Sequence, residues 1–150
     1  MQKITPFLWY DNQAEEAMNL YASIFKNSKV RNVHRAGGRV VSVTFELEGQ
    51  AIMALNAGPK YTFTEAFSFF VNCETQGEID EYWTRLIANG GAPSMCGWLK
   101  DKFGLSWQII PSALMQMLGD KDPERSKRVM DALLQMGKID IATLKRAYDG

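Results

Sequence analysis

Apolar and polar residues follow one pattern twice along the chain. A shift of sixty-two positions places Phe7 on Phe69 and keeps apolar residues on apolar residues through the segments that follow. In each copy a strand-like run, at residues 5–10 and 66–73, leads into a segment whose apolar residues recur at helical spacing. A strand–helix–strands unit that occurs twice predicts an α+β fold.

Both expected helices begin with capping signals. Asn12 with Glu15, and Thr75 with Glu78, place an oxygen-bearing cap three residues before a carboxylate, an arrangement that satisfies the free amides of a first turn. The second helix is expected to stop at Asn-Gly-Gly, residues 89–91, because a helix commonly ends at a glycine in the left-handed conformation.

Strand-like runs follow each helix. After the first helix they cover residues 29–35, 39–48 and 50–56, with Gly-Gly and Glu-Gly turns between them. After the second helix the runs at 94–101 and 105–110 are clear, and a rudimentary strand is expected near Ala92. The second copy is therefore expected to be the shorter one.

The pattern changes to helical spacing from Ser112 onward. A helix is expected at 113–118, a second from Asp122-Pro123 to a stop at Gly137, and a third after the cap Asp140. Two alternatives remain open for these helices. They pack on their own domain, or they contribute to the interface of a homodimer, which we expect the protein to form.

Composition narrows the classes of function. With 150 residues, 46% of them hydrophobic, the chain is long enough for one well-buried domain and too short for two ordinary ones. Seventeen basic residues balance seventeen acidic ones, so we expect no nucleic-acid partner and no binding to a membrane. The chain shows no signal peptide or spanning segment, and its two cysteines form no CxxC pair. We therefore expect a cytoplasmic protein with reduced thiols.

One hairpin resembles a known family signature. Residues 96–111, CGWLKDKFGLSWQIIP, are similar to the signature of the PhnB-like proteins, also labelled "3-demethylubiquinone-9 3-methyltransferase" domains, within the glyoxalase, bleomycin-resistance and extradiol-dioxygenase superfamily. Further matches lie at 4–11, 14–17, 53–59, 122–124 and 138–142. The resemblance implies two βαβββ modules around a cup-shaped cavity. It implies a single domain over residues 1–150, with modules at about 1–60 and 61–111 and a helical extension at 112–150.

The resemblance also locates a possible metal site. Enzymes of the superfamily hold a divalent metal with inward residues from the first and last strands of each module. The corresponding positions here are Pro6, Met53, Ser68 and Gln108, uncertain by one residue at each strand. Proline and methionine offer nothing useful to hard cations or to zinc, iron or nickel. We expect no metal.

Other candidates for chemistry are few. His34, the only histidine, is expected at the surface. Cys96 is expected to alternate with Trp98 and Lys100 onto one face of a strand, where the lysine would favour a thiolate; Cys96 and Gln108 are weak catalytic candidates because no base accompanies the thiol. No glycine-rich strand-to-helix turn indicates a nucleotide-like cofactor, so no cofactor is expected.

The resulting hypothesis is a metal-free protein that binds a small aromatic or apolar organic molecule in the cup. Two alternatives stay open: a metal-independent enzyme, such as a lyase, an isomerase or the methyltransferase of the label, and a dimeric interaction module whose cup is filled by side chains. The residues expected to bind the ligand are Leu8, Tyr10, Met53, Ser68, Phe70, Trp98, Ser106 and Gln108.

Overall fold

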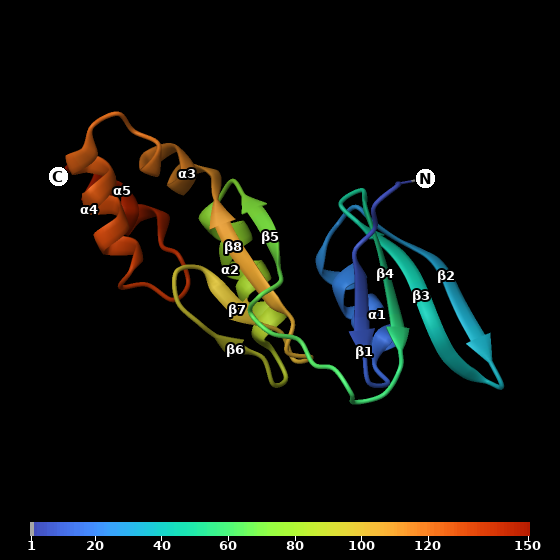
Figure 1. Cartoon of the computed structure of the whole chain (residues 1–150). Coiled ribbons are helices and arrows are strands. Elements are labelled where there is room, and N and C mark those ends of the chain that lie inside the picture. The colour runs from blue at the N-terminus through green and yellow to red at the C-terminus, as the bar shows by residue number, and fades with distance from the viewer. Residues whose placement is uncertain (1) are drawn as a thin grey trace. The chain divides into compact units, whose positions relative to one another are not determined.

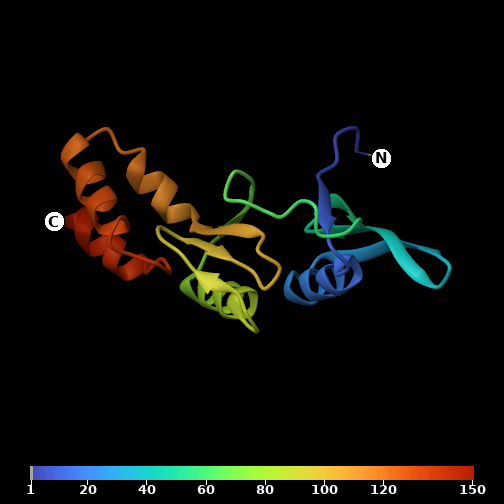
Figure 2. The same cartoon turned by 60° about the horizontal axis from the view of Figure 1, so that its bottom comes forward.

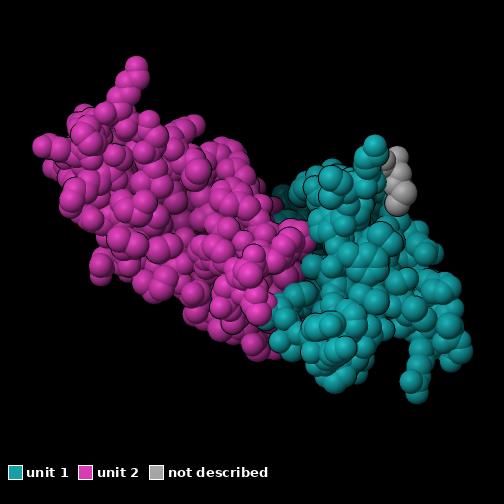
Figure 3. All heavy atoms as spheres, in the orientation of Figure 1, with its two compact units in different colours: residues 1–63 teal, residues 64–150 magenta. Residues whose placement is uncertain are grey.

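The structure of the protein is a computed structural model that describes residues 2–150. The chain forms two compact units, residues 1–63 and residues 64–150 (Figure 3). No helix within residues 2–150 is long and apolar enough to cross a membrane.

Unit 1 is a four-stranded sheet covered by one helix (Figure 1). Strand β1 pairs in parallel with β4, while β4 with β3 and β3 with β2 are antiparallel, giving the order β1-β4-β3-β2. The elements are β1 (Phe7–Tyr10), α1 (Ala14–Ile24), β2 (Ser28–Ala36), β3 (Arg39–Leu47) and β4 (Gln50–Asn56).

The core of unit 1 lies between α1 and one face of its sheet. The strands alternate, so that Leu8 and Tyr10 of β1 are buried on the helix side together with Ala54 of β4. The hydroxyl groups of Tyr10 and Tyr21 are 3.0 Å apart inside this core. His34 lies exposed on β2, which confirms its expected place at the surface.

The start of α1 differs from the prediction. Asn12 was expected to cap the helix, but Gln13 occupies the N-cap position and makes no side-chain capping bond. Instead Asn56 Oδ1, at the end of β4, accepts a hydrogen bond from the Ala14 amide at 2.8 Å. A residue distant in sequence satisfies the free amide, and so the local capping motif is not needed.

Unit 2 repeats the topology of unit 1. Its sheet has the order β5-β8-β7-β6, again with one parallel pair, β5 with β8, and α2 lies against one face (Figure 2). The elements are β5 (Ser68–Cys73), α2 (Gln76–Ile87), β6 (Ala92–Pro93), β7 (Trp98–Lys100) and β8 (Ser106–Pro111). Thr75 Oγ1 accepts from the Glu78 amide at 3.2 Å, which confirms the predicted cap.

Strand β7 is shorter than predicted, because the chain turns at Cys96 and Gly97. Both residues have the left-handed backbone conformation, with φ of 60° and 84°. Their amides donate hydrogen bonds to the carbonyls of Met136 and Gly137, respectively, each 2.8 Å long. A Cβ on Gly97 would lie 2.8 Å from the Cδ1 atoms of Ile110 and Ile139. The prediction of a strand over 94–101 is therefore wrong at its first half, where the backbone bonds to the C-terminal extension instead.

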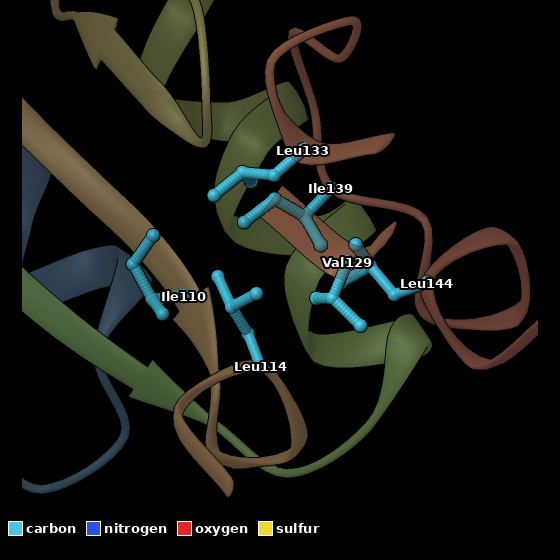
Figure 4. Packing of buried hydrophobic residues seen from close by; sticks show 6 residues of the cluster. All are labelled: Ile110, Leu114, Val129, Leu133, Ile139 and Leu144. Carbon is cyan, nitrogen blue, oxygen red and sulfur yellow. The ribbon is translucent and has the colours of Figure 1, made fainter. Parts of the chain in front are cut away.

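The extension contains α3 (Ser112–Leu118), α4 (Pro123–Leu133) and α5 (Ile141–Asp149). Asp122 and Asp140 cap α4 and α5 as predicted, although α4 ends before the expected stop at Gly137. The buried side chains of the extension form one cluster with the end of β8 (Figure 4). The cluster is made of Ile110, Leu114, Val129, Leu133, Ile139 and Leu144. The extension therefore packs on its own unit, and its contribution to a homodimer interface stays a prediction.

Candidate binding site on the second sheet

The face of the second sheet that α2 leaves uncovered carries two rows of side chains across three strands. In the first row, strand register places Gln108 between Phe70 and Trp98. In the second row, two residues away along each strand, it places Ser106 between Ser68 and Lys100. Cross-strand partners project to the same side of a sheet. The residues between them, Phe69, Trp107 and Leu99, project toward α2. We call the surface of these six side chains, Ser68, Phe70, Trp98, Lys100, Ser106 and Gln108, the open face.

The two predicted polar residues of the open face contact each other. Gln108 Nε2 donates to Ser68 Oγ at 2.9 Å across β8 and β5. Gln108 is half-buried, and Phe70 beside it is 50% exposed. This pair leaves the Gln108 carbonyl oxygen without a partner among residues 2–150, so it can accept a hydrogen bond from a ligand.

A pocket of about 360 Å³ opens beside β6 and β7. Its volume falls within the range of small-molecule sites, which combine apolar walls with a few polar groups. It is lined by Glu65, Ala92, Pro93, Ser94, Trp98, Leu99, Lys100 and Ser106.

Ser106 is the unusual residue of this pocket. Its side chain is 1% exposed, and its Oγ has no hydrogen-bond partner among residues 2–150. A buried hydroxyl without a partner costs stability, whereas most buried polar groups are paired. Ser106 therefore adds an unpaired hydroxyl to the residues around the pocket, although the oxygen itself is covered in this structure.

Lys100 brings charge to the same wall. Its ammonium group forms an ion pair with the carboxylate of Glu65, and their side chains are 44% and 63% exposed. The hydrogen bond and then the charge of Lys100 lower the pKa of the Glu65 carboxyl. Glu65 precedes β5 in a turn held by the hydrogen bond from the Phe67 amide to the Thr64 carbonyl, 3.4 Å long.

Asp101 is a buried residue whose importance the sequence interpretation missed. Although 2% exposed, its carboxylate accepts hydrogen bonds from the amides of Phe103 and Leu105 at 2.9 and 3.1 Å and from Trp107 Nε1 at 2.9 Å. It holds the turn that joins β7 to β8 and so fixes their register. The signal was an aspartate at the first position of a turn, where its side chain commonly binds backbone amides.

The residues predicted to bind a ligand divide into three groups. Trp98 and Ser106 line the pocket, and Ser68, Phe70 and Gln108 share the open face with them. Leu8 and Tyr10 are 4% and 3% exposed, in the core of unit 1 beneath α1. Met53 pairs with Phe7 on the opposite side of that sheet. Leu8 and Tyr10 were predicted to lie around the cavity together with Met53, but they lie on the other face of the sheet from Met53, because successive strand residues alternate between faces.

Cys96 is not positioned as predicted. It lies in the turn before β7 and does not alternate with Trp98 and Lys100 on a strand. Its thiol contacts the Leu133 carbonyl at 3.6 Å and packs against the cluster of the extension. Cys73 and Cys96 are both free thiols. Burial, followed by the charges of Glu78 and Glu74, raises the pKa of the Cys73 thiol to about 12, which disfavours the nucleophilic thiolate.

The residues at the superfamily's metal positions do not fit a metal. The structure pairs Phe7 with Met53, one residue from the Pro6 of the sequence alignment, and Phe70 with Gln108, two residues from its Ser68 and so outside the expected margin of one residue. Neither version of the set contains an imidazole, a thiolate or a carboxylate, the ligands that divalent metals prefer. Residues 2–150 contain no group of three His, Cys, Asp or Glu side chains arranged for a metal.

Comparison with known proteins defines the class. The PhnB protein from Bacillus cereus is 38% identical, with a TM-score of 0.70 over 74% of this chain and 100% of that one. Protein PA1353 from Pseudomonas aeruginosa shares the fold at 17% identity and a TM-score of 0.62, over 74% of this chain and 98% of that one. A glyoxalase/bleomycin resistance protein from Albidiferax ferrireducens T118 has 12% identity and a TM-score of 0.50, over 73% of this chain and 98% of that one. A search of curated proteins finds no match.

The two βαβββ units thus define a protein with the fold of the glyoxalase and bleomycin-resistance superfamily. The family model described as "3-demethylubiquinone-9 3-methyltransferase" matches residues 2–110, and the chain belongs to this PhnB-like family. The match ends one residue before the end of β8, so that α3, α4 and α5 lie outside it.

Proposed function

We propose that the protein binds a small, partly aromatic organic molecule on the open face of its second sheet, without a metal. The observation that carries the proposal is Ser106, a buried hydroxyl without a partner among residues 2–150, in the wall of a 360 Å³ pocket beside an indole. Trp98 supplies an aromatic surface, and Ser106 and Gln108 supply hydrogen bonds with a definite direction.

The metal-free part of the proposal rests on donor chemistry. Phe7, Met53 and Phe70 have side chains that bind hard or borderline metals poorly, and a single Gln108 amide would be a weak site alone. Chemistry that depends on a divalent metal at these positions is therefore not part of the proposed function.

The methyltransferase activity in the family's description is not part of the proposal either. Within residues 2–150 the turns from strand to helix, before α1 and before α2, contain no glycine-rich loop for a nucleotide-like cofactor. An enzyme that uses Cys96 as nucleophile is also disfavoured, because that thiol contacts a backbone carbonyl and packs against the helical extension, away from the open face.

The proposal also includes the localisation, oligomeric state and domain organisation of the protein. We expect a cytoplasmic homodimer in which residues 1–150 act as one glyoxalase-like domain. Two free cysteines fit a reducing compartment. Strand β2 is an exposed edge with unpaired backbone groups, a feature that proteins often cover through association.

A ligand screen tests the proposed function. Small aromatic compounds that raise the melting temperature of the full-length protein are titrated by tryptophan fluorescence against wild type, Ser106→Ala and Gln108→Ala. Each substitution should weaken binding by about tenfold, the loss of about one hydrogen bond. Ser126→Ala, whose hydroxyl contacts only the backbone of the first turn of α4, is the matched control. Equal binding by all four proteins would place the site elsewhere and reject the proposal.

A further inference from the structure

We propose, as an extension of the proposed function, that the pocket takes an aromatic carboxylate, whose anionic group binds Lys100 and Ser106 while its ring lies against Trp98. In the structure Glu65 forms the ion pair with Lys100 that this carboxylate would form. Glu65 is thus a competitor tethered to the protein itself, and the ligand displaces it.

The geometry of strands β7 and β8 brings the required groups together. Lys100 and Trp98 are two residues apart on β7 and therefore lie on the same side of the sheet. Ser106 is the cross-strand partner of Lys100 on β8. All three line the pocket, so a planar molecule can contact the indole while its polar end reaches the ammonium group. The covered Ser106 hydroxyl becomes accessible to it only when the side chains around that oxygen move.

A carboxylate matches the unsatisfied chemistry of these side chains. The Ser106 hydroxyl is a donor without a partner among residues 2–150, and a hydrogen bond to a charged acceptor is stronger than one to a neutral acceptor. Lys100 is the only cationic side chain among the eight lining residues. One cation suits a single carboxylate better than a phosphate, which proteins commonly hold with several cations or backbone amides.

The ion pair with Glu65 shows that Lys100 already binds a carboxylate, although this carboxylate makes no hydrogen bond to Ser106. Glu65 belongs to the turn of residues 64–67 before β5 and to no strand or helix. The side chains of Glu65 and Lys100 are 63% and 44% exposed, and exposed ion pairs contribute little to stability. Displacing Glu65 therefore costs little, and a ligand that also buries a ring against Trp98 and pairs Ser106 can compete with it.

The apolar part of the pocket selects an aromatic body. Ala92 and Pro93 add apolar surface beside Trp98, and stacking on the indole favours a flat ring. The volume of about 360 Å³ admits a compact bicyclic molecule.

Two matched probes separate the contribution of the charge to binding from that of the ring. 2-Naphthoate and 2-naphthamide have nearly the same shape and differ in charge. Isothermal titration of the full-length protein should show tighter binding of 2-naphthoate. Lys100→Met should weaken 2-naphthoate by about tenfold or more, the loss of one charge-assisted contact, and leave 2-naphthamide within about twofold.

Substitution of Glu65 should change the affinity for 2-naphthoate in the opposite direction. Glu65→Gln should strengthen 2-naphthoate binding by about threefold to tenfold, because Lys100 loses its internal partner, and should leave 2-naphthamide unchanged. Lys127→Met removes a comparable exposed ion pair, with Asp131 on α4, and should change neither affinity. Circular dichroism verifies that each variant is folded.

The outcomes distinguish this inference from the proposed function. Two results would reject an anionic ligand without rejecting the binding pocket. The first is equal affinity for both probes, and the second is an affinity for 2-naphthoate that neither Lys100→Met nor Glu65→Gln changes. If neither probe binds while the screen finds other aromatic ligands, only the inference fails. If Ser106→Ala leaves both affinities unchanged, the pocket is not the site and the inference fails with the function on which it rests.

Discussion

The carboxylate of Asp101 accepts a hydrogen bond from the indole N–H of Trp107, 2.9 Å long, across the turn that joins β7 to β8. Both residues are 2% exposed. The same carboxylate accepts hydrogen bonds from two backbone amides of the turn, so that one side chain fixes the turn and orients a fully buried tryptophan of unit 2. On the other side of the sheet this turn sets the positions of Lys100, Ser106 and Gln108.

We predict that this contact contributes strongly to stability. Asp101→Ala should lower the free energy of unfolding by about 3 kcal/mol, because it leaves buried N–H groups without acceptors. Trp107→Ala should cost about 3 kcal/mol or more through the cavity it creates. Urea unfolding measures both changes.

A double-mutant cycle isolates the contact. Trp107→Phe removes the donor but keeps an aromatic ring, and combined with Asp101→Ala it should show a coupling of about 1–2 kcal/mol. Asp131→Ala, at an exposed aspartate of α4, serves as control and should change stability by less than about 0.5 kcal/mol. Additive effects of the two substitutions at Asp101 and Trp107 would show that their hydrogen bond adds nothing.

Local patterns predicted most of the fold. The residues of β4, 50–56, were predicted without error, and the caps Thr75, Asp122 and Asp140 are confirmed. These features depend on neighbours in sequence. The cap of α1 and the start of β7 were wrong for the opposite reason, because Asn56 and Met136 satisfy backbone groups far away along the chain, and no local pattern reports such a bond.

The candidate site was predictable only in part. Alternation along β8 placed Ser106 and Gln108 on one face, and the structure brings Trp98, Phe70 and Ser68 to the same face. Leu8 and Tyr10 were misplaced, because alternation identifies two faces of a strand without saying which one the helix covers. Glu65 could not be found at all, since its contact with Lys100 depends on the path of an irregular segment.

The Gln108 side chain is predicted to matter little for stability. Gln108→Ala removes one hydrogen bond between half-buried groups, to Ser68, and should lower the free energy of unfolding by no more than about 1 kcal/mol. Trp107→Ala, one residue earlier on the buried side of β8, provides the contrast. A Gln108→Ala variant that fails to fold would identify Gln108 as a structural residue and remove it from the proposed site.

Metal content is predicted to be low. Protein purified without chelator, dialysed and analysed by mass spectrometry for Ni, Zn, Fe, Mn and Co should contain well under one equivalent of any of them, because the positions Phe7, Met53, Phe70 and Gln108 lack suitable donors. A dialysis-resistant, stoichiometric metal would show that other residues assemble a site.

The helical extension is predicted to stabilise unit 2. Gln76 joins α2 to it through two hydrogen bonds, to the Ile139 carbonyl at 2.9 Å and from the Ile141 amide at 2.8 Å. Gln76→Ala should therefore lower the free energy of unfolding by about 1–3 kcal/mol, whereas Gln135→Ala, at an exposed position of the extension, should have little effect.

Truncation addresses the role of the extension in assembly. Light scattering should find a dimer for the full-length protein, and truncation after Pro111 should produce monomer or aggregate, since it uncovers the buried Ile110. A full-length protein that is monomeric at micromolar concentration would reject the dimer. A truncated chain that remains a stable dimer would exclude the extension from the interface.

The last prediction concerns alkaline pH. The pKa of the Cys73 thiol is raised to about 12 from an ordinary value of 9.0, first by burial and then by the charges of Glu78 and Glu74. The unfolded chain therefore loses this proton first, and between about pH 9 and 12 the folded state binds more protons than the unfolded state. Because stability falls with pH where the folded state holds the extra proton, this group should reduce the free energy of unfolding by at most about 1.4 kcal/mol per pH unit in that range.

The comparison with Cys73→Ala separates the thiol from other groups that titrate in the same range. Urea unfolding at pH 8, 9 and 10 should show wild type losing stability faster than the variant above pH 9, with parallel behaviour below it. A thiol reagent at pH 8 should leave Cys73 unmodified in the folded protein and modify it in urea, because only the exposed thiolate reacts. Identical pH dependence in the two proteins, or rapid modification of Cys73 in the folded state, would show that the thiol is not held in its neutral, buried form.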